Sequence, residues 1–124
     1  MRRRPCSCAF TGHRPGKLPW GEDESDLRCI ALKAKLRAAV DNARAFLRIQ
    51  EEFGSFDAYL WGFAPGAPFR RAPGAPVPAQ TPLSREISRD LRRRGMKFVG
   101  PVIVYSFLQS VGVVNDHDAD CAFA

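Results

Sequence analysis

The chain has 124 residues, of which 45% are hydrophobic and 26% are charged, and its formal net charge is +6. This balance is typical of one compact globular domain and excludes collagen-like, coiled-coil and wholly disordered chains. The most apolar run, residues 98–114, is interrupted by glycine, proline and glutamine, so it does not provide the continuous apolar segment that a membrane-spanning helix needs.

The first segment combines a basic start with a short strand pattern. Residues 6–11 are typical of a short strand, and the glycines and proline of residues 12–16 predict a turn after it. No apolar core of signal-peptide length follows the initial arginines, so we expect a cytoplasmic protein with no membrane partner. In that compartment the unevenly spaced cysteines are expected to be free thiols or metal ligands rather than disulfides.

A long amphipathic helix is predicted from about Asp26 to about Gln50. Its apolar residues recur at three- and four-residue steps, and Gly54 ends the pattern. Residues 56–63 then form a short aromatic helix or turn. The aromatic side chains of this region are expected either to pack in the core, which is the commoner case, or to stack on a nucleic-acid base. They are Phe53, Phe56, Tyr59, Trp61 and Phe63.

Residues 64–80 carry five prolines, so they predict a loop rather than a helix or a central strand. A helix begins at Thr81, which is placed to cap it, with proline at its first position. A tight hairpin at residues 95–100 leads to a second helix that is apolar nearly all round and is therefore expected to be buried. Gly112 ends that helix, and a polar tail follows.

The hairpin is the strongest functional signal in the sequence. Residues 66–110 hold eight basic and two acidic side chains, so most of the positive charge is concentrated there. Two glycines let the backbone expose amide donors beside the positive end of the next helix, which favours an anion. We therefore predict contacts to the phosphates of double-stranded DNA. The alternatives are an ordinary helical hairpin and a solvated basic face; the predicted DNA-contact residues are Arg92, Arg93, Arg94, Gly95, Lys97 and Gly100.

A possible metal site lies in the polar tail. His117 and Cys121 are four residues apart, so on a helical turn both side chains face one direction and could bind one zinc ion. Two ligands are too few for a structural site, and apart from Cys29 the other cysteine and histidine candidates are Cys6, Cys8 and His13. A surface histidine beside a free cysteine is the alternative.

Most of the chain resembles one known family. From about residue 39 to the end it is similar to the C-terminal half of bacterial DNA-3-methyladenine glycosylase I, a helix-hairpin-helix-like repair enzyme. We therefore expect a mainly α fold, a glycosylase half-domain over residues 39–124. The matching stretches are Asp41 to Leu47, Gly54 to Phe63, Thr81 to Ser84 with Ile87 and Ser88, and Leu91 to Cys121.

The N-terminal segment resembles a different family. Residues 8–36 are similar to the first strand, loop and helix of a Rossmann-like family in the SLOG superfamily, which is thought to sense nucleotides or ADP-ribose-type ligands. The loop Thr11 to Pro15 holds one glycine after the strand, whereas a full dinucleotide fingerprint holds more. This resemblance predicts a separate strand-loop-helix fragment over residues 1–38 and, as an alternative function, ligand binding by it.

The glycosylase resemblance implies hydrolysis of the N-glycosyl bond of 3-methyladenine in alkylated DNA. It implies a flipped base held between aromatic rings and recognised by a carboxylate, with Tyr105 and Ser106 bordering the pocket. It also implies a structural zinc ion, with His117 and Cys121 as one of two ligand pairs. The other pair, the glutamate that binds the base and most pocket aromatics belong to the family's N-terminal half. We therefore expect DNA attachment, but not base excision, from this chain; no protein partner can be named.

Overall fold

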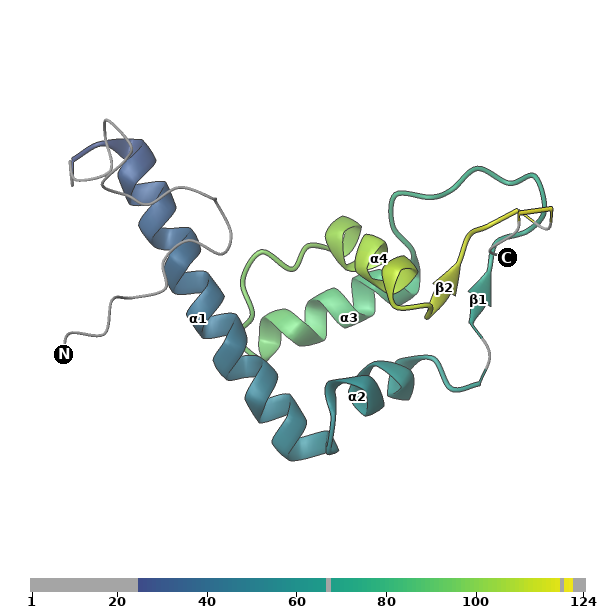
Figure 1. The fold of residues 1–124 in the computed structure, drawn as a ribbon, viewed down its shortest axis with the longest axis horizontal. Coiled ribbons are helices and arrows are strands. Elements are labelled where there is room, and N and C mark those ends of the chain that lie inside the picture. The colour runs from purple at the N-terminus through teal and green to yellow at the C-terminus, as the bar shows by residue number, and fades with distance from the viewer. Residues whose placement is uncertain (1–24, 67, 119, 122–124) are drawn as a thin grey trace. The chain divides into compact units, whose positions relative to one another are not determined.

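The computed structural model describes residues 25–66, 68–118 and 120–121. The chain divides into two compact units, Met1–Val40 and Asp41–Ala124, and each is described by itself. Within the described residues no helix is both long and apolar enough to cross a membrane. Figure 1 labels the elements, which are α1 (Leu27–Phe53), α2 (Phe56–Phe63), β1 (Phe69–Arg70), α3 (Pro82–Arg93), α4 (Pro101–Ser110) and β2 (Val114–Asn115).

The described part of the first unit is the beginning of α1. Asp26 lies at the start of this helix. Its carboxylate accepts a hydrogen bond from the backbone N–H of Arg28 at 2.8 Å and also pairs with the guanidinium of Arg28. These bonds from Arg28 lower the pKa of Asp26. The predicted start of the long helix is therefore confirmed. The predicted strand at 6–11 and turn at 12–16 lie outside the described residues, so the Rossmann-like piece stays a prediction.

Local sequence signals account for the helices of the second unit. Ser55 caps α2 by accepting from the N–H of Ala58 at 2.9 Å. Thr81 and Ser84 form a reciprocal capping box at the start of α3, with proline at the first helical position, as the sequence predicts. The mainly helical prediction is confirmed for this unit, and it agrees with a glycosylase fold.

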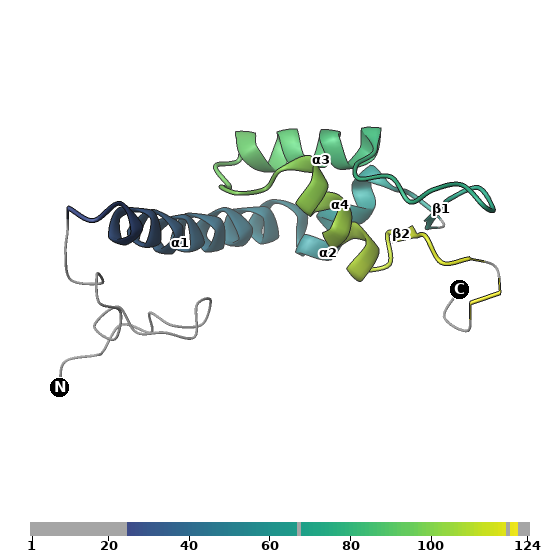
Figure 2. The same ribbon diagram turned by 90° about the horizontal axis from the view of Figure 1, so that it is seen from above.

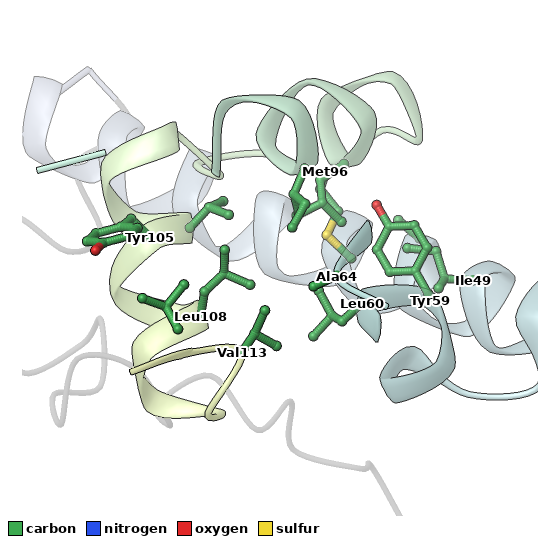
Figure 3. Packing of buried hydrophobic residues seen from close by; sticks show 13 residues of the cluster. Ile49, Tyr59, Leu60, Ala64, Met96, Tyr105, Leu108 and Val113 are labelled. Atoms are coloured by element: carbon green, nitrogen blue, oxygen red, sulfur yellow. The ribbon is translucent and has the colours of Figure 1, made fainter. Parts of the chain in front are cut away.

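The core of the second unit lies where α2, α3 and α4 meet the end of α1. Figure 3 shows Tyr59, Leu60, Met96 and Leu108 among the side chains that fill it. The fourth helix is only half buried, which corrects the expectation that it lies wholly inside. Its inner face packs against α3 and β2, whereas the opposite face is open: Val102, Ile103, Phe107 and Val111.

Two short strands were missed by the sequence reading. Within the proline-rich segment, β1 pairs in parallel with β2, and the register sets Phe69 opposite Val114 and Arg70 opposite Asn115. Both views place this strand pair at one end of the second unit and the turn between α3 and α4 at the other (Figures 1 and 2). The unit therefore presents two distinct ends, each with its own group of predicted functional residues.

Candidate nucleic-acid interface

The turn between α3 and α4, residues 94–100, is called here the α3–α4 loop. Its second residue, Gly95, has φ +96°, a backbone conformation that residues with a side chain rarely adopt, so glycine is required. The N–H of Gly95 donates to the carbonyl of Arg92, and that of Met96 donates to the carbonyl of Leu91, both at 3.0 Å. These bonds end α3 in the way that glycine commonly ends helices. The predicted hairpin is confirmed.

Side chains from other elements hold the rest of the loop. Asn42 on α1 makes two hydrogen bonds to the backbone of Lys97, and Ser88 on α3 donates to the carbonyl of Val99 at 2.6 Å. Arg48 on α1 donates to the carbonyl of Arg94 at 3.1 Å. The loop is thus fixed by polar contacts at three points. Sequence reasoning did not single out these three side chains.

The amide donors of the loop fall into two sets. Those of Gly95, Met96 and Lys97 are used inside the protein, so the expectation that the glycine-bracketed turn exposes its donors is too broad. Those of Phe98, Val99 and Gly100 donate to no group in the described part of the chain. Gly100 caps α4 without a side-chain hydrogen bond. The second half of the loop therefore joins free N–H groups to the positive end of a helix, which suits an anion.

One face of α3 carries exposed, unpaired cations. Arg85, Arg89 and Arg92 follow each other at four- and three-residue steps, so they share a face, and all three are exposed. No carboxylate within the described residues pairs with them. The guanidinium of Arg92 lies 3.7 Å from the point where a Cβ on Gly100 would sit, which brings this face beside the free amides. We call these three residues the exposed arginine face; exposed Lys97 lies in the adjoining loop.

The last arginine of the run lies in a different environment. The Arg94 guanidinium donates to Asp90 and Glu52, both at 2.6 Å, and only 22% of its side chain is exposed. It also lies over the rings of Phe53 and Tyr59, 5.0 and 5.3 Å from their centres. These contacts occupy Arg94, so its predicted role in DNA binding competes with an internal one.

Asp90 is the buried centre of this group. The Tyr59 hydroxyl donates to its carboxylate at 2.8 Å, and Arg93 pairs with the same carboxylate from a largely exposed position. Burial by itself would raise the pKa of Asp90, but the hydrogen bonds from Arg94, Tyr59 and Arg93 lower it overall. Burial and the bond to Asp90 raise the pKa of the Tyr59 hydroxyl. Glu52, Tyr59, Asp90 and Arg94 are called the Arg94 network below.

The aromatic residues of α2 belong mainly to the core. The Tyr59 ring is buried against Phe53, Phe56 and Phe63, with centres 5.2 to 5.4 Å apart. Phe56 stacks on Phe46 at 4.6 Å. Of the two predicted uses of this cluster, packing is therefore the one that the contacts support.

The two predicted pocket residues face different surroundings. Tyr105 is buried, and its hydroxyl donates to Asp116, to which Gln109 also donates at 2.6 Å. Burial, followed by the bond to Asp116, raises the pKa of Tyr105 to about 12. Ser106 is exposed, and its hydroxyl donates to the carbonyl of Val102 at 3.3 Å. Tyr105 lines a surface cavity of about 450 Å³ beside β1 and the proline-rich segment, whereas Ser106 does not.

The two predicted zinc ligands lie together in the C-terminal tail. Cys121 Sγ is 3.3 Å from His117 Nδ1. In tetrahedral zinc sites, bond lengths of about 2.3 Å to sulfur and 2.0–2.1 Å to nitrogen set these two atoms about 3.6 Å apart, so the pair fits one edge of such a site. Within the described ranges no third histidine, cysteine or carboxylate joins them. Cys6, Cys8 and His13 lie outside those ranges.

Arg71 anchors the tail that carries this pair. Its guanidinium is nearly buried and donates to the carbonyl of Asp116 at 2.7 Å, to the Asp118 carboxylate at 2.5 Å and to the carbonyl of Ala75 at 2.5 Å. These bonds bring the proline-rich segment and the tail together. The position of His117 therefore depends on Arg71, which in the sequence is only one of the eight basic residues of the stretch 66–110.

The family model described as methyladenine glycosylase matches residues 22–124. The chain belongs to this family. DNA-3-methyladenine glycosylase 1 of Escherichia coli is 36% identical over 98 residues, which cover 77% of this chain and 52% of that protein. DNA-3-methyladenine glycosylase of Haemophilus influenzae is 37% identical over 94 residues, covering 74% and 51%. The chain thus spans about half the length of the curated relatives it matches.

Solved structures give the same result. A 3-methyladenine DNA glycosylase I variant in complex with 3-methyladenine aligns with a TM-score of 0.67 and 34% identity, over 72% of this chain and 49% of that one. The 3-methyladenine DNA glycosylase I of Staphylococcus aureus aligns with a TM-score of 0.66 and 34% identity, over 72% and 48%. At these identities the similarity supports both fold and family.

The family match also bears on the N-terminal resemblance. Because it begins at residue 22, it includes most of the helix that the SLOG-like resemblance assigned to residues 8–36. The remaining part of that resemblance, the loop Thr11 to Pro15, lies outside the described residues. The fusion of two families is thus without support, and the domain boundary at residues 38 and 39 stays a prediction.

Proposed function

We propose that this chain forms the DNA-binding part of a methyladenine glycosylase and acts in base-excision repair of 3-methyladenine in alkylated double-stranded DNA. The assignment of 3-methyladenine as the substrate base is supported by its relatives, which are DNA-3-methyladenine glycosylases, and by one aligned structure that holds 3-methyladenine itself. Because the chain spans only about half the length of those relatives, its own residues determine which part of the activity it supplies.

The observation that carries the proposal is the exposed arginine face beside the free amides of the α3–α4 loop. Three guanidinium groups that pair with no carboxylate among the described residues and the exposed Lys97 give a row of positive charge, and the amides of residues 98–100 offer uncharged donors next to it. Phosphate oxygens accept from both kinds of donor. Such contacts hold a duplex in place without reading its sequence, as in a helix-hairpin-helix-like element.

The chemistry of the substrate explains why binding and excision are separable. Methylation at N3 makes the adenine a cationic leaving group, so its N-glycosyl bond is already weak. The enzyme must still extrude the nucleotide, at a cost of about a few kcal/mol, and hold the base. In the proposal Ser106, which is exposed, borders that base, whereas Tyr105 supports the pocket through its bond to Asp116. The recognising carboxylate comes from the part of the family fold that this chain does not span.

A structural zinc ion is part of the proposal. His117 and Cys121 would hold it as neutral imidazole and thiolate, and their 3.3 Å separation is compatible with that geometry. When bound, the ion would tie the C-terminal tail to two further ligands. Replacing both residues by alanine should abolish stoichiometric zinc in the purified protein, as measured by elemental analysis. An unchanged zinc content would contradict the assignment.

Two assays on one sample test the proposed function. A labelled duplex should bind with an affinity that falls steeply between low and moderate salt, because phosphate contacts release counterions. The 124 residues by themselves should release no free 3-methyladenine from alkylated DNA above background, because the resemblance places the recognising carboxylate in the other half of the family fold. Salt-independent binding, or no binding, would contradict the first part, and efficient release of the base would contradict the second.

A cytoplasmic location belongs to the same proposal, since the proposed substrate is cellular DNA. The alternative function, binding of a nucleotide or ADP-ribose-type ligand by the N-terminal segment, has no supporting observation in the described residues. Thermal stabilisation by ADP-ribose would test it directly.

A further inference from the structure

The α3–α4 loop contains one strained residue. Phe98 has φ +56°, the left-handed region, which is uncommon and strained for a large side chain. The residue is 67% exposed, so packing of its side chain does not hold the backbone in place. A strained conformation persists only where the surroundings determine it. The contacts that fix Phe98 must therefore come from its neighbours in the chain.

Side-chain hydrogen bonds hold the residues on both sides of Phe98. Before it, Asn42 Oδ1 accepts from the Lys97 N–H at 2.7 Å, and Asn42 Nδ2 donates to the Lys97 carbonyl at 3.0 Å. After it, Ser88 Oγ donates to the Val99 carbonyl at 2.6 Å. Asn42 thus satisfies both backbone groups of one residue 55 positions away. Asn42 therefore fixes the peptide unit directly before Phe98, and Ser88 fixes the unit between Val99 and Gly100, so the strained residue lies between two held points.

These restraints coincide with the free donors. The amides of Phe98, Val99 and Gly100 follow directly after the residue that Asn42 holds, and Arg92 lies beside Gly100. A loop that is already ordered does not lose its conformational entropy when it binds, and this raises affinity without any new contact. The Asn42 amide already uses both of its polar atoms on the loop, which leaves it little capacity to bind a phosphate.

We propose that Asn42 is a positioning residue for DNA: by bonding both backbone groups of Lys97 it orders the α3–α4 loop so that the amides of residues 98–100 face a phosphate. This inference rests on the proposed DNA-binding function. Asn42 acts through the loop, so its removal should change the energy needed to order the loop and leave the number of phosphate contacts unchanged.

Salt titrations separate these two effects. The slope of log affinity against log salt counts phosphates, at about 0.9 per contact on duplex DNA. Binding of a labelled mixed-sequence duplex is measured by anisotropy at several NaCl concentrations. Asn42→Ala should lower affinity about three- to tenfold at every concentration with an unchanged slope, as expected for a loop that must be ordered on binding. Lys97→Ala should make the slope shallower by about 0.9.

The matched control is Gln50→Ala, which removes an amide from the same helix that makes no hydrogen bond to the loop among the described residues. It should bind like the unaltered protein. Ser88→Ala, which releases the other side of Phe98, should repeat the Asn42→Ala result and serves where the latter folds poorly. Amide hydrogen exchange supplies a second readout: exchange of the Lys97 N–H should accelerate in Asn42→Ala, while that of Leu108 in α4 stays slow.

Two results would overturn the inference. One is an Asn42→Ala protein that binds the duplex as tightly as the unaltered chain; the other is a slope as shallow as that of Lys97→Ala, which would make Asn42 a phosphate contact. If the unaltered protein itself fails to bind the duplex, the proposed function falls and the inference with it. The exchange rate of the Lys97 amide would then still report whether Asn42 orders the loop.

Discussion

Arg94, which directly follows α3, and the three arginines of the exposed arginine face on that helix have opposite surroundings. In the Arg94 network, the guanidinium is mostly covered, pairs with two carboxylates and lies over two rings. On the exposed arginine face, Arg85, Arg89 and Arg92 are open and pair with no carboxylate in the described part of the chain. The difference shows that adjacent basic residues in a sequence serve different purposes: Arg94 stabilises the fold, and the others are available for a ligand.

The largest expected effect is on the fold. Arg94→Ala would leave Asp90, which is 8% exposed, with only Tyr59 and the exposed Arg93 as partners. We expect a loss of about 2–3 kcal/mol in the free energy of unfolding, since removing one member of a buried ion pair is strongly destabilising. Chemical denaturation measures it. Arg92→Ala is the matched control and should change stability by less than about 0.5 kcal/mol; equal losses in the two variants would contradict the comparison.

The next effect is on DNA. Replacing Arg85, Arg89 and Arg92 together by alanine should weaken duplex binding about 10- to 100-fold at low salt and reduce the salt slope by about 2–3, because each lost phosphate contact removes about 0.9. Titrations by anisotropy check both numbers. Arg70→Ala, at the opposite end of the second unit, removes one charge that is also exposed and should leave the slope unchanged. A slope that falls by about 0.9 in this single-charge control, as expected for one arginine of the exposed face, would show that net charge, not position, matters.

A smaller effect is expected inside the Arg94 network. Tyr59→Phe keeps the ring but removes the hydrogen bond to Asp90, which should cost about 1–2 kcal/mol. Because Arg94 and Tyr59 share one carboxylate, the two substitutions should not be additive. A double-mutant cycle by denaturation measures their coupling. Strict additivity would mean that the network acts as independent pairs.

The smallest effect is a pH dependence. Hydrogen bonds from Arg94 lower the pKa of Glu52 below its ordinary value of 4.5. The pKa of Asp90 is also lower than its ordinary value of 3.8, because the bonds from Arg94, Tyr59 and Arg93 outweigh the effect of burial. A carboxyl with a lowered pKa contributes stability above its ordinary pKa and loses it as the pH falls through the lowered value. Unfolding free energy should therefore decrease below about pH 5, and less steeply in Asp90→Asn. The same pH slope in both proteins would argue against the network.

Local signals in the sequence predicted most of the secondary structure. The cap at Thr81, the glycine at 95 and the apolar spacing of α1 act within a few residues, so they are legible without the fold. The two-residue strands β1 and β2 carry no such signal, because their pairing depends on register between distant segments.

Functional residues follow the same rule. The basic stretch 66–110 and the four-residue spacing of His117 and Cys121 were visible, since both can be seen along the chain itself, although the described residues of the tail that carries the pair are not helical. Two long-range contacts could not be predicted from the sequence. They are the ion pair between Arg94 and Glu52, 42 residues apart, and the hydrogen bonds between Asn42 and Lys97, 55 residues apart. Long-range pairing of a single polar side chain leaves no periodic pattern.

The most direct test of DNA binding by the α3–α4 loop is a residue-by-residue one. Backbone amide resonances of the second unit are followed by NMR while a short duplex is added. We expect the largest shifts at Phe98, Val99 and Gly100, with smaller ones along the exposed face of α3 and little change at β1 and β2. Shifts that cluster at the strand pair, or none at the loop, would contradict the account.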